Sequence, residues 1–122
     1  MYDDITFNEA NPRKGIIINQ PNSQNVYQGV PKDYTGENVT TQKKSSVLLA
    51  NKSGLTGGSG QVLDSGPDAN TFIYYSDHGS YGLVGMTTGE MKAKDFIGVL
   101  KKKHEARSYG QMEAHFLDFT LS

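Results

Sequence analysis

The chain has 122 residues, 35% of which are apolar, and a formal net charge of −1 at pH 7. This length allows one domain, and the interspersed acidic and basic residues leave no basic surface of the kind that binds nucleic acid or an anionic membrane. The chain contains no cysteine, which excludes disulfides and thiol nucleophiles, and no apolar run approaches the roughly 18 residues that a membrane span needs.

The first half of the chain reads as loops with one strand and one helix. The β-branched run Gly15–Asn19 predicts a strand, one arm of a hairpin. Residues 20–38 are rich in Pro, Gly, Asn and Asp, which predicts a loop with room for a short strand at residues 26–27. Thr40 or Thr41 can cap a helix that stops near Asn51.

The second half alternates helical and extended patterns. After a glycine-rich loop over residues 52–70, the run TFIYYS (71–76) is apolar on both faces, which predicts a central parallel strand covered by helices above and below. Residues 81–89 predict a short excursion or a hairpin. Glu90–Arg107 predicts an amphipathic helix, whose apolar face would hold Met91, Phe96, Ile97 and Leu100. Strand, hairpin and helix in this order are part of a βαβ unit, so the expected fold class is α/β.

His78 directly follows the expected central strand. Open α/β sheets place reactive groups just beyond the carboxyl ends of their strands, and an imidazole can act there as a general acid or base. A loop histidine held by a neighbouring residue is an equal alternative on position alone. The N–H of Gly79 could approach a substrate carbonyl oxygen as an oxyanion-hole donor.

Other motifs predict no further chemistry. His78, His104 and His115 lack metal-ligand spacing, so we expect no metal and no cofactor. Ser59 stands between glycines, but Gln61 breaks the G-x-S-x-G pattern of serine hydrolases. Asn38-Val39-Thr40 and Asn51-Lys52-Ser53 would make Asn38 and Asn51 acceptors of N-linked glycans in a secretory protein.

The stretch FIYYSDHGSYGLVGM (72–86) closely resembles the legumain family of cysteine peptidases, the asparaginyl endopeptidases, whose plant branch is called vacuolar processing enzymes. VPKDYTGE (30–37) and DFIGVLKKKHEARSYGQM (95–112) follow in family order. The resemblance implies a caspase-like three-layer sandwich around a mostly parallel sheet. It also implies hydrolysis of peptide bonds after asparagine in peptides or proteins, in proteolytic processing and vacuolar protein catabolism. A vacuolar or lysosomal location follows by resemblance, although residues 1–15 lack the apolar region of a signal peptide.

The resemblance also assigns roles to three neighbouring residues. His78 matches the histidine that polarises the cysteine thiol and helps to protonate the leaving amine. Gly79 matches the glycine whose N–H contributes to the oxyanion hole. Asp77 matches an aspartate that some members carry as a succinimide, a feature linked with their peptide-ligase activity.

The chain departs from the family where the nucleophile is expected. The family carries its cysteine in Glu-Ala-Cys-Glu-Ser-Gly-Ser, whereas here Gln111-Met112 runs into EAHFLDFTLS. If Glu113-Ala114 keeps the family register, His115 stands at the cysteine position and the intervening strand is deleted; if residues are counted on from Met112, the match ends there. We expect part of a legumain-like peptidase domain at residues 1–112, a divergent tail at 113–122, and no nucleophile.

Met1 aligns inside the family's second strand, so we expect the family's first strand to be missing as well. The strand at residues 72–75 would then have two open edges, unless the alternating segment 114–122 adds as a replacement strand. Two hypotheses follow. The chain is a fragment of a legumain-type peptidase that keeps the histidine but is inactive alone, or it is a non-catalytic binding fragment that associates with a full-length relative.

Overall fold

The structure is a computed structural model that describes residues 1–2 and 4–118. Among them, short 3-10 helices lie at Ile5–Phe7 (η1), Gly36–Asn38 (η2) and Lys52–Gly54 (η3), and α-helices at Thr41–Leu48 (α1) and Ala93–Glu105 (α2). Strands run over Asn70–Asp77 (β1), Gly79–Ser80 (β2), Leu83–Gly85 (β3), Glu90–Lys92 (β4) and Gln111–Asp118 (β5). No helix in these described ranges is long and apolar enough to cross a membrane.

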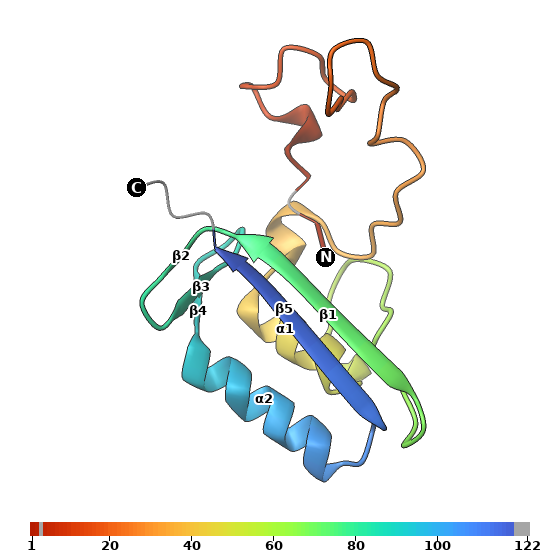
Figure 1. Cartoon of the computed structure of the whole chain (residues 1–122), viewed down its shortest axis with the longest axis vertical. Coiled ribbons are helices and arrows are strands. Elements are labelled where there is room, and N and C mark those ends of the chain that lie inside the picture. Colours follow the sequence, from red (N-terminus) through yellow and green to blue (C-terminus); the bar gives the residue numbers. More distant parts are fainter. Residues whose placement is uncertain (3, 119–122) are drawn as a thin grey trace.

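Two small sheets organise the second half of the chain (Figure 1). β1 and β5 pair in parallel, with Asn70 opposite Gln111 and Asp77 opposite Asp118. α2 lies in the connection between them, since parallel strands need a crossover. β2, β3 and β4 form an antiparallel sheet in that order, which confirms the predicted hairpin.

β5 provides the replacement strand that the sequence offered as an alternative. It is the parallel partner of β1, although it carries no cysteine, so one of the two edges expected to be open is paired. The fold class is confirmed as α/β, consistent with a partial caspase-like fold. The predicted division of the chain between residues 112 and 113 stays a prediction; it falls within β5, and residues 119–122 of the tail lie outside the described residues.

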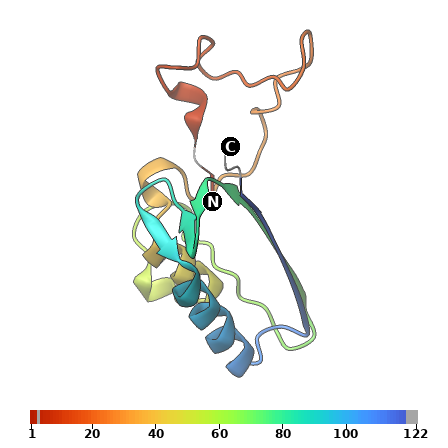
Figure 2. The same ribbon diagram turned by 60° about the vertical axis from the view of Figure 1, so that its left-hand side comes forward.

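Both α-helices lie on the same side of the β1–β5 sheet (Figure 2). The core lies between the helices and this face, with Ile73 and Tyr75 of β1 packed on a cluster of buried residues: Leu48, Met86, Met91, Phe96 and Val99. On the other face Phe72 is 63% and Tyr74 59% exposed. The predicted cover on both faces of this strand is therefore wrong for the described residues, because successive side chains alternate between a covered face and an open one.

The two predicted helices are present with shifted ends. α1 begins after Thr40, whose Oγ1 accepts a hydrogen bond from the N–H of Lys43 at 3.2 Å, which confirms Thr40 as the cap. α1 ends at Leu48, ahead of Asn51, which instead caps η3.

α2 begins three residues later than predicted. The segment Glu90–Lys92 pairs with β3 as strand β4 before the helix starts at Ala93. Ile97 was placed on the apolar face but is 51% exposed, and Val99, at 8% exposure, takes its place in the core. The later start of the helix thus goes with a different buried face from the one predicted.

The predicted strand at Gly15–Asn19 and the short one at residues 26–27 do not form. The backbone is held by side chains instead: Asn25 Oδ1 accepts the N–H of Ile17 at 3.0 Å, and Asn11 Nδ2 donates to the carbonyl of Ile16 at 3.2 Å. Local asparagine bonds compete with strand pairing in this way. The segment loops away from the helices and the sheet (Figure 1).

Candidate active site

The backbone at His78 is fixed by the hairpin that follows it. β1 ends at Asp77, His78 is exposed, and Gly79 opens β2 and pairs with Val84 of β3. The N–H of Gly85 donates to the carbonyl of His78 at 2.9 Å. A Cβ at Gly85 would lie 2.3 Å from that carbonyl oxygen, so only glycine allows this approach.

Asp77 is half-buried, and both of its carboxylate oxygens accept hydrogen bonds. Oδ1 lies 2.6 Å from the backbone nitrogen of His78, and Oδ2 accepts from the hydroxyl of Tyr75 at 3.2 Å. The same hydroxyl contacts the carbonyl oxygen of Gly85. Asp77 is therefore tied both to the backbone of His78 and, through Tyr75, to the hairpin.

Lys44 of α1 lies buried behind this end of β1, at 7% exposure. Its Nζ is 3.4 Å from the ring centroid of Tyr75 and 5.2 Å from that of Phe96, and no acceptor among the described residues bonds it. Burial lowers the pKa of Lys44 to about 8, and the negative charge of Asp77 opposes that shift. Lys44 was not predicted as a site residue, although it stands four residues before the buried Leu48, which places it on the helix face that packs.

A cavity of about 110 Å³ lies beside His78. It is lined by Asp77 at the end of β1, by His78, by Gly79 at the start of β2, and by Phe116 and Leu117 of β5. The volume is well below the roughly 300 Å³ at which small-molecule sites begin. The described part of the neighbouring strand thus presents apolar side chains, and no thiol, to this cavity.

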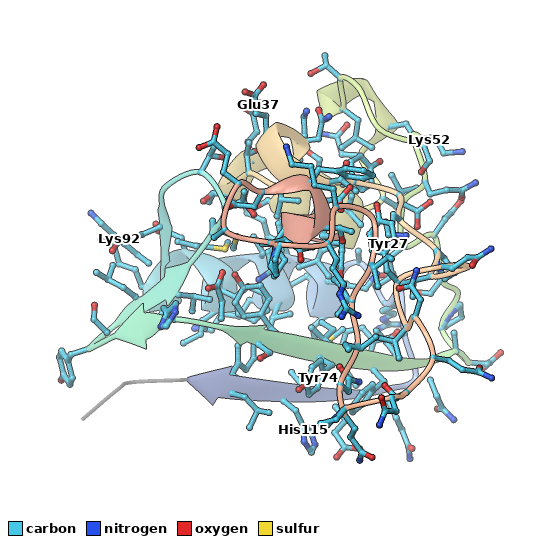
Figure 3. The ribbon with its side chains drawn as sticks, turned by 90° about the horizontal axis from the view of Figure 1, so that it is seen from above. Tyr27, Glu37, Lys52, Tyr74, Lys92 and His115 are labelled. Atoms are coloured by element: carbon cyan, nitrogen blue, oxygen red, sulfur yellow. The ribbon has the colours of Figure 1, made fainter. Side chains whose placement is uncertain are left out.

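The other two histidines lie apart from this cavity. His115 stands opposite Tyr74 on β5, with Nε2 2.5 Å from Oε1 of Glu113 and its ring 5.4 Å from that of Phe72. Figure 3 shows Tyr74 and His115 on the side of the sheet away from the helices. His104 contacts the hydroxyl of Tyr109 at 3.2 Å. Within the described residues, no three His, Cys, Asp or Glu side chains gather in a way that could hold a metal ion.

The two sequon asparagines differ in their surroundings. Asn38, at the end of η2, is half-buried, and its Oδ1 accepts from Nζ of Lys43. Asn51 is exposed, and its Oδ1 accepts from the hydroxyl of Ser53 at 2.7 Å. Of the two, Asn51 is the more accessible.

Comparison with known proteins decides the family. A model described as the Peptidase C13 family matches residues 1–115. The chain belongs to this family. Its relatives include a vacuolar-processing enzyme of Citrus sinensis, 59% identical over 89% of this chain, and the vacuolar-processing enzyme delta-isozyme of Arabidopsis thaliana, 57% identical over 92%. A legumain of Canavalia ensiformis is 53% identical over 92% of the chain.

These relatives confirm the resemblance to the legumain family that was based on the stretch 72–86, which contains Asp77-His78-Gly79. The names of the family and of these relatives describe peptidases and processing enzymes, which act on peptides or proteins. The chain spans 22%, 24% and 24% of the length of the three relatives named above. The activity of a whole enzyme is therefore not transferred to this chain by identity alone.

Proposed function

We propose that this chain carries the histidine part of an asparaginyl endopeptidase site and has no peptidase activity by itself. The observation that supports this proposal is the placement of His78 and Gly79 directly beyond the end of β1, in a chain that contains no cysteine. The end of a parallel strand is where an α/β fold presents reactive groups.

In the proposed chemistry, His78 takes the proton of a cysteine thiol and returns it to the leaving amine, while the N–H of Gly79 stabilises the oxyanion. Without a thiolate no acyl-enzyme forms, and loss of a catalytic nucleophile costs on the order of 10⁶ in rate. An imidazole alone does not replace that step.

The test is incubation of the purified chain with a peptide that contains asparagine, followed by mass spectrometry. We expect no cleavage. Cleavage after asparagine that His78→Ala abolishes and His104→Ala leaves intact would contradict the proposal, because His104 is an exposed histidine on α2, apart from the cavity.

Asp77 is proposed as the position of a succinimide. The 2.6 Å distance between Oδ1 of Asp77 and the nitrogen of His78 supports this, since ring closure joins that nitrogen to the side-chain carbon and releases water. Intact-mass analysis after storage at mildly acidic pH would show a species lighter by one water, absent from Asp77→Ala. An unchanged mass would refute the assignment.

A vacuolar location is proposed from the names of the relatives. Passage through the secretory pathway would expose both sequons to glycosylation, and we expect occupancy at Asn51 to exceed that at the half-buried Asn38. Expression behind a secretory leader checks this: Asn51→Gln should remove more glycan mass than Asn38→Gln, and equal losses would count against it.

A second candidate function is non-catalytic association with a full-length relative. The open face of the β1–β5 sheet favours it, because Phe72 and Tyr74 are exposed there and β1 pairs only with β5 among the described strands. A pull-down with an intact vacuolar-processing enzyme tests it. Binding should be lost in Phe72→Glu and kept in Ile97→Glu, which alters an exposed residue of α2; no binding by the unaltered chain would exclude this function.

A further inference from the structure

Loops of the N-terminal segment (residues 4–32) line a second cavity of about 580 Å³, which is open to solvent and larger than the one beside His78. Its volume falls in the range of small-molecule sites, about 300–1,000 Å³. Its lining includes Ile5 and the consecutive Ile16, Ile17 and Ile18, and it shares no residue with the cavity beside His78. Whatever this cavity holds is therefore independent of the proposed peptidase role.

Side-chain hydrogen bonds fix the walls of the cavity. Asn11 Nδ2 donates to the carbonyl of Thr6 at 2.7 Å and to that of Ile16 at 3.2 Å. From the other side, Asn25 accepts from the N–H of Ile17 at 3.0 Å and donates to the carbonyl of Gly15 at 3.2 Å. Hydrogen bonds thus hold the backbone of the isoleucines in place before a ligand binds, so less conformational entropy is lost on binding.

The backbone N–H and carbonyl groups of Ile16 and Ile17, in the wall of the cavity, are not available to pair with a peptide strand. The N–H of Ile16 donates to the carbonyl of Arg13 at 3.0 Å, and the carbonyl of Ile17 accepts from the N–H of Val26 at 2.8 Å. With the bonds of Asn11 and Asn25, all four backbone groups of these two residues are engaged. A ligand would therefore be recognised by side chains, which favours a small molecule over an added strand.

Arg13 is the only charged residue among those that line the cavity. Its side chain is exposed and makes no hydrogen bond or ion pair within the part of the chain that the structure describes. A guanidinium at the rim of an apolar cavity matches a ligand with an apolar body and an anionic end, because it binds a carboxylate through two parallel hydrogen bonds.

We propose that this cavity binds an amphipathic carboxylate, with its hydrocarbon chain among Ile5 and Ile16–Ile18 and its carboxylate on Arg13. The apolar chain leaves water on binding, and the charged end stays at the open rim. Neither group requires the burial of an unpaired charge.

The experiment is a titration of the isotopically labelled full chain at pH 7 with decanoate and with decanol, its uncharged counterpart, followed through backbone amide shifts. We expect shifts at residues 5–18 and roughly tenfold tighter binding of decanoate than of decanol, a modest gain because water screens a carboxylate–guanidinium pair at an exposed rim. Arg13→Gln should make the two affinities equal. Lys14→Gln, which alters the exposed neighbour outside the lining, should keep the tenfold difference.

Ile17→Asn supplies a second variant, expected to weaken both ligands while the amide shifts of β1 and α2 stay unchanged. Equal affinity of the unaltered chain for decanoate and decanol would overturn the proposal, as would shifts confined to the open sheet face around Phe72. If Ile17→Asn fails to fold, the comparison of Arg13→Gln with Lys14→Gln still decides it.

Discussion

Lys44 is a buried lysine with a lowered pKa that lies next to the candidate site. Its ammonium group is held against the faces of Tyr75 and Phe96, so a cation–π interaction offsets part of its desolvation. Tyr75 in turn bonds Asp77, next to His78. A buried cation therefore lies behind the end of the strand from which the proposed catalytic histidine emerges.

Lys44 should make the chain less stable at neutral pH than above it. Its pKa is about 8 when folded and about 10.5 when unfolded, so the unfolded chain binds more protons between these values and the free energy of unfolding rises with pH across that window. Lys44→Met should raise stability at pH 7 by roughly 1–3 kcal/mol and flatten this dependence. Urea unfolding of both proteins from pH 7 to 10.5 checks it; a less stable Lys44→Met would show that the ring contacts outweigh desolvation.

At the scale of elements, local signals predicted much of the fold. The cap at Thr40 and the spacing of α2 each specify a helix locally, and the apolar run of β1 specifies a strand that finds its partner in β5. The strand predicted at Gly15–Asn19 does not form, because a β-branched segment needs a partner strand. Hydrogen bonds with the side chains of Asn11 and Asn25 take up its backbone groups instead. Likewise, His78 and its neighbours were identified by their motif. The spacing of Lys44 from Leu48 places Lys44 on the packed face of α1, but the rings of Tyr75 and Phe96 that it meets there come from distant parts of the chain.

β5 should be stabilised by one aromatic side chain. Phe116 meets Phe96 edge to face, with ring centroids 5.1 Å apart, and its ring centroid lies 6.1 Å from that of Tyr75. Its neighbour Leu117 has a similar exposed fraction, 48% against 42% for Phe116, but no aromatic ring to make such contacts. Phe116→Ser should therefore cost about 1–2 kcal/mol and lower hydrogen-exchange protection across Phe72–Tyr75. Leu117→Ser is the matched control and should change either quantity much less. Protection in β1 that does not respond to Phe116→Ser would mean that β5 does not hold this sheet together.

At the scale of the whole molecule, the chain divides into an α/β part with a buried apolar core and an N-terminal segment (residues 4–32). This segment is held by side-chain hydrogen bonds and by contacts of half-buried or exposed aromatic rings. The buried cluster comprises Leu48, Met86, Met91, Phe96 and Val99, all from the α/β part. In the N-terminal segment Ile5, Phe7 and Val26 are 56%, 59% and 42% exposed. Local unfolding free energies follow buried apolar contact, so the N-terminal segment should open without the rest.

A substitution at Asn25 tests this division, because the Asn25 side chain joins the backbone near Ile17 to the backbone near Tyr27. Oδ1 accepts from the N–H groups of Ile17 and Tyr27 at 3.0 Å each, and Nδ2 donates to the carbonyl of Gly15 at 3.2 Å. Asn25→Ala leaves these three half-buried groups unpaired, and each lost bond favours opening by about 1 kcal/mol. Limited proteolysis between residues 13 and 32 should therefore accelerate by roughly a hundredfold. The melting temperature of the α/β part should be the same in Asn25→Ala as in the unaltered chain.

Gln24→Ala is the control for Asn25→Ala, since the exposed side chain of Gln24 makes no hydrogen bond within the described residues, and its cleavage rate should match that of the unaltered chain. Faster cleavage in both variants would point to a segment without defined structure. A drop in the melting temperature of Asn25→Ala would instead mean that the segment and the core unfold together, because the loss of loop bonds would then reach the helices and the sheet.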